Sequence, residues 1–189
     1  MHPETDEQLM LKVRDGDVER LAVLYERHRT RLLGFFVRLT GSVPSSEDLV
    51  HDVFLRMLKY RHTFNADHRF ITWMYQVARN AQSDFHRKRQ HDAPADLAMP
   101  DGNREQSCPA ATPDEQVGQE QELELLQRVL AGLPEDLREV LVLSRFQELK
   151  YEEIARVLNC GIGAVKMRMH RGLKELRHRF IAATGKELK

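Results

Sequence analysis

The first ninety residues alternate apolar and polar positions with the period of an α-helix. Leu9 and Val13 share one face of a segment from Asp6 to Asp15, and Gly16 separates it from a longer segment that runs from Asp17 to about Thr40. We expect two helices here, the second ended by a glycine at position 41. The apolar face of the longer helix consists of Leu21, Leu24, Tyr25, Leu32, Phe35, Phe36 and Leu39.

Two further helical patterns follow. Ser45 or Ser46, followed by two acids, favours a helix start, because a hydroxyl can cap the first turn and acids suit its positive end. The fourth pattern runs from about Arg69 to Arg89. Four helices of these lengths can close one core, so we predict a four-helix domain over residues 1–90. The apolar positions of the third helix are Leu49, Val50, Val53, Phe54, Met57 and Leu58.

The composition changes between residues 91 and 120. This stretch is rich in Pro, Ala, Asp, Glu and Gln and has no repeating apolar face, which is typical of a flexible linker. Its charge is nearly all negative, and it offsets the basic segments on either side. The whole chain therefore has a formal net charge of zero, although its charges are segregated.

A second helical block occupies residues 121–189. Pro134 sits just inside a helix start, and the stretch "YEEIARVLNCGIGAVKMRMHRG" indicates two amphipathic helices joined by a tight turn. We expect Gly161 to supply the backbone freedom of that turn. A short turn before a basic helix is typical of a helix-turn-helix. The fold class is therefore predicted as all-α: two small helical domains joined by a flexible acidic linker, the C-terminal one containing a helix-turn-helix.

The last helix has two distinct faces. Val165, Met169, Leu173 and Leu176 are expected to face the core. The opposite face would meet something negative, but a solvated basic stripe is common on surface helices, so this helix alone leaves DNA contact and plain solvation both open. The opposite face carries Lys166, Met167, His170, Arg171 and Lys174.

The segment from Arg69 to Arg89 combines aromatic, amide and basic residues on one helix. If Met74, Val77 and their neighbours face inward, Phe70, Trp73, Gln76, Asn80 and Arg87 lie roughly on the other side. Rings stack on unpaired bases and amides bind base edges, so this face suits single-stranded nucleic acid. The alternative is that Trp73 belongs to the core, where amphipathic aromatics are often found.

No enzyme or cofactor signature competes with nucleic-acid binding. The sequence lacks a phosphate-binding loop and the H-E-x-x-H spacing of a zinc site, and Cys108 and Cys160 show no metal-ligand spacing. We therefore expect no catalysis, no metal and no cofactor. No apolar run approaches the length of a membrane span and the N-terminus is polar, so we expect a cytoplasmic protein without direct membrane insertion.

The motifs in series resemble the extracytoplasmic-function group of the sigma-70 family of bacterial RNA polymerase sigma factors. The likeness rests on "DLVHDVFLRMLK", "RFITWMYQVARNAQSDFHRKR" and "LPEDLREVLVLSRFQELKYEEIARVLNCGIGAVKMRMHRGLKELR", in this order. It implies a non-enzymatic factor that directs core polymerase to promoters. It also implies a region 2-like domain at residues 1–90, a linker at 91–120 and a region 4-like domain at 121–189. Promoter DNA, double-stranded and melted, and an anti-sigma protein, which can hold such factors at the inner membrane, are the implied partners besides core polymerase.

The resemblance assigns roles to three sets of residues. The implied contacts with core polymerase are Asp48, Asp52, Val53 and Phe54, although Val53 and Phe54 also fit a core. The implied minus-ten readers are Phe70, Trp73, Gln76, Asn80, Arg87 and Lys88. The implied minus-35 readers are Lys166, Met167, Arg168, His170, Arg171 and Lys174.

The chain departs from the family pattern at three positions of the helix-turn-helix. Ala164 stands where the family usually has Thr, Met167 where it has a small hydroxyl residue, and Gly161 where Pro is frequent. The resemblance therefore does not carry over a promoter sequence. Two other readings stay open at this stage: a stand-alone helix-turn-helix regulator and an interaction module that sequesters polymerase.

Overall fold

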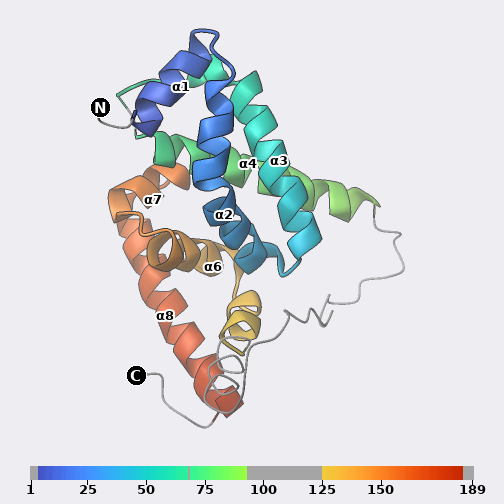
Figure 1. The fold of residues 1–189 in the computed structure, drawn as a ribbon. Helices are drawn as coiled ribbons and strands as arrows, with labels where there is room; N and C mark the ends of the chain where they lie inside the picture. The colour runs from blue at the N-terminus through green and yellow to red at the C-terminus, as the bar shows by residue number, and fades with distance from the viewer. Residues whose placement is uncertain (1–3, 68, 93–124, 185–189) are drawn as a thin grey trace, which may run out of the picture.

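The computed structural model describes residues 4–67, 69–92 and 125–184, and every regular element among them is a helix (Figure 1). The prediction of an all-α fold is thus confirmed. The predicted linker lies almost wholly in residues 93–124, outside the described part of the chain. The N-terminal half contains α1 (Asp6–Arg14), α2 (Arg20–Thr40), α3 (Val43–Lys59), the 3-10 turn η1 (Arg61–Thr63) and α4 (Phe70–Asp92).

The C-terminal half begins with a short helix over residues 125–131. It continues with α6 (Glu135–Leu141), a π-helical turn η2 (Val142–Phe146), α7 (Tyr151–Val157) and the long α8 (Ile162–Thr184). In Figure 1, α8 runs down one side of the molecule, and α4 lies across α2 and α3. The pattern of apolar residues predicts these helices, apart from the 3-10 turn η1 and the π-helical turn η2.

Local capping explains where the first helices begin and end. Thr5 and Gln8 form a reciprocal capping box at the start of α1. Gly41 ends α2 in the left-handed conformation, with φ 71°, as expected. The predicted start of α3 at Ser45 or Ser46 was wrong: Ser42 is the N-cap, its hydroxyl accepts a hydrogen bond from the Ser45 amide, and a proline lies in the first turn.

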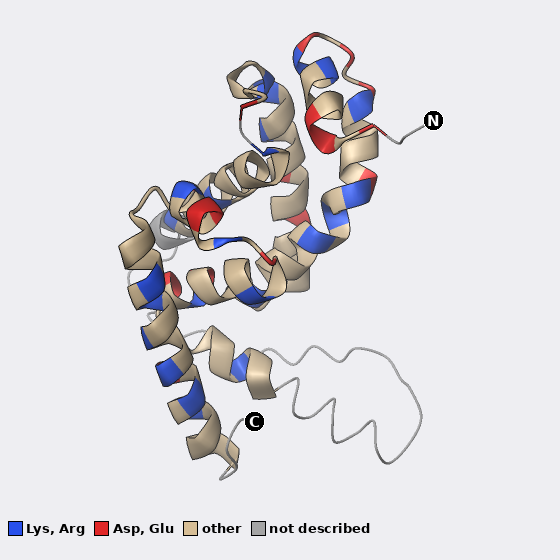
Figure 2. Ribbon diagram, turned by 90° about the vertical axis from the view of Figure 1, so that its left-hand side faces the viewer, with Lys and Arg blue, Asp and Glu red and all other residues tan. Residues whose placement is uncertain are grey.

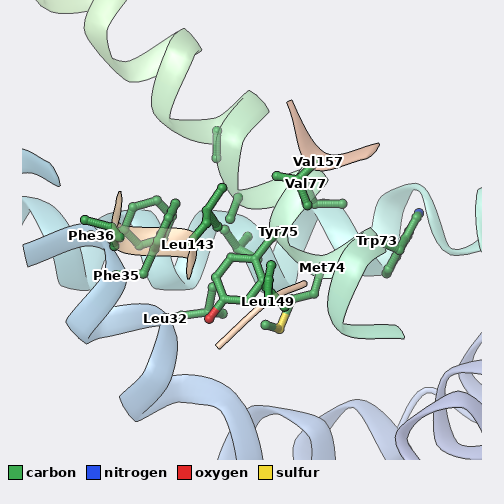
Figure 3. Packing of buried hydrophobic residues seen from close by; sticks show 14 of the residues in the cluster. Leu32, Phe35, Phe36, Trp73, Met74, Tyr75, Val77, Leu143, Leu149 and Val157 are labelled. Carbon is green, nitrogen blue, oxygen red and sulfur yellow. The ribbon is translucent and has the colours of Figure 1, made fainter. Parts of the chain in front are cut away.

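One apolar core runs through both halves of the chain. Phe35 and Tyr75 pack edge to face with ring centroids 5.1 Å apart, and both are fully buried. Leu143 and Leu149 of the C-terminal half belong to the same buried cluster (Figure 3). The sequence had predicted two tethered helical blocks, and the structure packs these blocks against each other.

Candidate nucleic-acid interface

The helix-turn-helix consists of α7, a four-residue turn and α8. The turn is made by Asn159, which adopts φ 49°, in the left-handed region that Asn tolerates better than most residues. Gly161 is not left-handed; it precedes α8, and its carbonyl accepts hydrogen bonds from the amides of Ala164 and Val165. The expectation that Gly161 supplies the turn's freedom was therefore wrong, because the chain reverses two residues earlier.

The inner face of α8 packs close to α6. Val165 and Met169 are buried as expected, but Leu173 is 37% exposed, which corrects its assignment to the core. Gly172 takes the inner position instead: a Cβ atom there would lie 3.1 Å from Leu141 Cδ1. The absence of a side chain at this position is what lets α8 approach α6 so closely.

The outer face of α8 is basic and exposed. Met167 lies in the middle of it with 56% of its surface exposed, and Arg168 is half-buried at the edge, 3.7 Å from Asp136. No acidic residue occurs between positions 162 and 174, and Figure 2 shows lysine and arginine recurring along this helix. Such a face can pair with phosphates and reach base edges in a major groove. Its other exposed side chains are Lys166, His170, Arg171 and Lys174.

The start of α4 is more deeply buried than its pattern indicated. Phe70 is fully buried, and Trp73 is 9% exposed, with its ring edge to face with Phe64 at 5.3 Å. The indole N–H of Trp73 donates to the hydroxyl of Thr63 at 3.4 Å. The expectation that Phe70 shares an open face with Asn80 was thus wrong, and for Trp73 the alternative of a position in the core is confirmed, because the segment before α4 covers both.

Farther along α4 the polar residues are accessible. Asn80 is exposed and lines a surface pocket of about 340 Å³ between α3 and α4. Arg56 donates to Asp84 there at 2.7 Å, and this hydrogen bond lowers the pKa of the Asp84 carboxyl. Asp84 also accepts from Arg87 at 2.8 Å, which orients that exposed guanidinium. The other residues that line the pocket are Tyr60, Val77 and Ser83.

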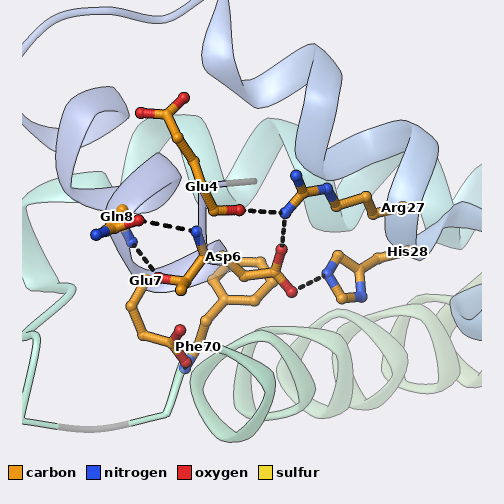
Figure 4. A network of polar contacts seen from close by, with 8 residues as sticks. Glu4, Asp6, Glu7, Gln8, Arg27, His28 and Phe70 are labelled. Atoms are coloured by element: carbon orange, nitrogen blue, oxygen red, sulfur yellow. Dashed lines mark hydrogen bonds and ion pairs between the residues drawn. The ribbon is translucent and has the colours of Figure 1, made fainter. Parts of the chain in front are cut away.

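The first turn of α4 is held by the N-terminal helix. A Glu7 side-chain oxygen accepts from the amide of Phe70 at 3.0 Å, so that a carboxylate caps the positive end of α4. Asp6 in turn accepts from Arg27 at 2.8 Å and lies 2.7 Å from His28 Nε2, which ties α1 to α2 (Figure 4). The apolar pattern alone assigns no functional role to α1, although the two acids in its first turn, Asp6 and Glu7, are visible in the sequence.

The accessible face of α3 differs from the one expected. Asp48 is exposed and Asp52 is half-buried, paired with Arg56 at 2.9 Å. Val53 and Phe54 are buried in the core, whereas Leu55 is 67% exposed. The sequence alone could have predicted the exposure of Leu55, because this residue does not lie on the same helical face as the inward apolar residues of α3.

The part of the chain that the structure describes lacks both a membrane-spanning helix and a metal-binding cluster. None of the helices there is long and apolar enough to cross a bilayer. Within the same residues, no group of three or more His, Cys, Asp or Glu side chains is arranged to hold a metal ion.

Family models match both halves of the chain. "Sigma-70 region 2" matches residues 24–91, and "Sigma-70, region 4" matches residues 123–176. The chain is 32% identical over 172 residues to RNA polymerase sigma factor CarQ of Myxococcus xanthus, covering 89% of this chain and 93% of CarQ. It is 29% identical over 171 residues to the ECF RNA polymerase sigma factor SigW of Bacillus subtilis, covering 88% of this chain and 91% of SigW.

Solved structures share the fold. CnrH, in a complex with the cytosolic domain of CnrY, superposes with a TM-score of 0.71 at 21% identity, over 96% of this chain and 99% of that chain. The sigma factor RpoE of Bartonella quintana, in a complex with the anti-sigma factor NepR, gives 0.65 at 22% identity, over 92% of this chain and 99% of that chain. Family models, relatives and fold agree, and the chain belongs to the extracytoplasmic-function group of the sigma-70 family of RNA polymerase sigma factors.

Proposed function

We propose that this sigma factor reads the minus-35 element with the outer face of α8. The observation that carries the proposal is the exposed basic face around Met167, presented by a helix whose other side is packed against α6. Arg171 and Lys174 would bind guanine or phosphate, and Met167 offers apolar contact to a thymine methyl group. Arg168, paired with Asp136, contributes at the edge of this face. Lys166 and His170 complete it.

We propose that α4 reads the minus-ten element through its accessible residues. Asn80 would bind a base edge at the pocket, and Gln76, one turn earlier on α4, would assist it. Arg87 and Lys88, farther along the helix, would bind the phosphates of the same DNA strand. Phe70 and Trp73 are buried below this surface, where their packing and the hydrogen bond of Trp73 to Thr63 hold α4 against η1. This division of roles replaces the uniform aromatic and amide face expected from the sequence.

Core polymerase would dock on the exposed face of α3. Asp48 supplies a charge there, and we add Leu55 as the apolar contact because it is the most exposed large apolar side chain among the described residues. Asp52, Val53 and Phe54 support this face through the ion pair with Arg56 and through the core. We expect Leu55→Glu to weaken binding to core polymerase, and Val23→Glu on α2 to serve as the control.

The remaining partners follow from the same role. RpoE of Bartonella quintana was solved with an anti-sigma factor, and we propose that a protein of this kind binds the present chain too. Its site of action would be the cytoplasm, where polymerase and DNA meet, with an anti-sigma protein able to hold it at the inner membrane. We keep residues 1–90 and 121–189 as the two functional domains and 91–120 as their linker.

The test is promoter-directed transcription with purified protein and bacterial core polymerase on a genomic promoter library. Asn80→Ala and Arg171→Ala should each lower specific initiation by roughly five- to 150-fold, the value of one to three kcal/mol for a base contact. The control is Arg29→Ala on α2, because the Arg29 side chain contacts only Glu26 and the Tyr25 ring of the same helix in the interactions described. Unchanged initiation in both variants would refute the residue assignments.

The two alternatives make different predictions in the same assay. A stand-alone regulator would bind discrete operators without polymerase, yet the match of the first half to Sigma-70 region 2 supports a sigma factor instead. A sequestering module would bind polymerase and leave Asn80 and Arg171 dispensable. As a sigma factor, the chain directs the polymerase to promoters and is not itself an enzyme.

A further inference from the structure

A second surface pocket, of about 430 Å³, lies between α4 and α6. Its volume falls within the range of sites that bind small molecules. It shares only Ser83 with the pocket at Asn80, so it is a separate site. The residues that line it are Arg79, Gln82, Ser83, Glu135, Asp136 and Glu139.

One buried group of this pocket lacks a hydrogen-bond partner. Gln82 is 4% exposed, and among the described residues no donor lies within hydrogen-bonding distance of its side-chain oxygen. A buried acceptor without a donor costs free energy, and native structures supply a donor for nearly all such groups. A ligand that donates to Gln82 would remove this cost.

Most of the other polar groups in the pocket are acceptors as well. The ionised carboxylates of Glu135, Asp136 and Glu139 accept hydrogen bonds and cannot donate. Glu139 is buried, and one of its oxygens accepts from Arg79 Nε at 3.1 Å. Arg79 and Arg168, the latter 3.7 Å from Asp136, offset two of the three negative charges. The ligand that matches this pocket is therefore a cation with donors and no acceptors.

The surroundings of the pocket indicate which kind of cation it suits. Within the described residues, no group of His, Cys, Asp or Glu side chains is arranged to hold a metal ion. None of the exposed large apolar side chains there lines the pocket, whereas protein interfaces have apolar and aromatic centres. An alkylammonium group has three donors and no acceptor. The pocket thus fits a small organic ammonium better than a metal ion or a partner protein.

The spacing of the carboxylates sets the length of the ligand. Glu135 and Glu139 are four residues apart on α6, which corresponds to a rise of about 6 Å. An extended chain of four carbons places its two terminal nitrogens about 6 Å apart, given bonds of about 1.5 Å. One ammonium can therefore lie beside Glu139 and the other beside Glu135 at the exposed rim.

We propose that this pocket binds an aliphatic diamine with four carbons between its nitrogens. The Gln82 oxygen accepts a hydrogen bond from one ammonium, and the carboxylates of α6 pair with both ends, so that the ligand bridges α4 and α6. The site does not depend on the proposed reading of promoters, because it uses neither Asn80 nor the outer face of α8.

The test is isothermal titration calorimetry of 1,4-diaminobutane into the full-length chain, without DNA or polymerase. Gln82→Met removes the acceptor at nearly constant shape and should weaken binding at least about tenfold, the value of a hydrogen bond to a charged group. Glu135→Gln removes one charge of the pocket and should also weaken binding. Glu26→Gln removes the same charge from an exposed pair with Arg29 on α2, and it should leave binding unchanged.

Two further probes test the chemistry of the ligand. 1-Aminobutane carries a single ammonium and should bind at least about tenfold more weakly than the diamine, and Mg²⁺ should not displace the diamine. The diamine should also raise the Tm of wild type more than that of Gln82→Met. Far-UV circular dichroism verifies folding; should Gln82→Met unfold, Glu135→Gln tests the site alone, because Glu135 is exposed.

Several results would overturn the proposal. Wild type might bind no diamine, or Gln82→Met and Glu135→Gln, when folded, might bind it as tightly as wild type. An equal loss of affinity in Glu26→Gln would show that the diamine responds to net charge and not to the pocket. Equal binding of 1-aminobutane, or displacement by Mg²⁺, would contradict a site for two ammonium groups.

Discussion

The turn between α7 and α8 allows one substitution to be tested at two neighbouring positions. Asn159 is left-handed, with φ 49°, whereas Gly161 is not, and a Cβ atom at Gly161 would meet no heavy atom within 4 Å. Gly161 also occupies the N-cap position of α8, where its carbonyl accepts from the Ala164 amide at 3.0 Å. Serine should therefore be harmful at position 159 and favourable at position 161.

The two effects have different sizes. Asn159→Ser should lower the free energy of unfolding by about 1 kcal/mol. An ordinary residue with a Cβ atom pays roughly 1–2 kcal/mol in the left-handed region, and Asn recovers part of this cost because its side chain can hydrogen-bond to the local backbone. Gly161→Ser should raise it by a few tenths of a kcal/mol, because serine caps a helix better than glycine. With a urea m-value of about 2 kcal/mol/M, the first change moves the midpoint by about 0.5 M.

Urea unfolding followed by far-UV circular dichroism would measure both changes. Asn159→Gly is the control, and it should cost less than Asn159→Ser because glycine enters the left-handed region freely. Binding of a minus-35 duplex should weaken with Asn159→Ser, since the turn sets the direction of α8. If Gly161→Ser costs more stability than Asn159→Ser, the reversal of the chain depends on Gly161 and our reading of the turn is wrong.

Two further predictions concern the packing of the two halves. Leu143→Ala should lower the free energy of unfolding by about 2–5 kcal/mol, because Leu143 is fully buried in the shared core. Urea denaturation measures this change, and a loss below about 1 kcal/mol would contradict the shared core. Burial raises the pKa of Glu139 above its ordinary value of 4.5, and the nearby Arg79 offsets part of this rise. As the pH falls, the folded state therefore binds the Glu139 proton at a higher pH than the unfolded state does. The resulting contribution to stability is fully present below pH 4.5 and is lost as the pH rises through the folded pKa. Relative to Glu139→Gln, wild type should therefore gain stability as the pH falls from 7 toward 5, and a relative loss in matched unfolding curves would refute this sign.

The helices and the basic face of α8 could be predicted because local periodicity fixes them. Lys166, Arg171 and their neighbours recur on one side of α8, while Val165 and Met169 recur on the other. An amphipathic surface helix has one buried side, so the period of its apolar residues alone predicts which residues are buried and which are exposed. Their contact with DNA stays a prediction.

The burial of Phe70 and Trp73 could not be predicted in the same way. Both lie outside the main apolar face of α4, and they are covered by Phe64 and the 3-10 turn before the helix. Coverage by a segment of irregular structure leaves no periodic signal. The contact of Tyr75 with Gln147 joins residues 72 positions apart, and no local pattern reports it.

Polar contacts as well as apolar ones hold the two halves together. Arg31, Gln76 and Arg138 all donate to backbone carbonyls of the opposite half, at 3.0, 3.0 and 2.7 Å. The neutral donor Gln76 contributes only about 0.5–1.5 kcal/mol net and each charged guanidinium about 1.5–3 kcal/mol, because water competes for the same groups in the unfolded chain. Removing one of these donors costs most where the carbonyl left without a partner stays buried, so the three contacts differ in what a single substitution would lose.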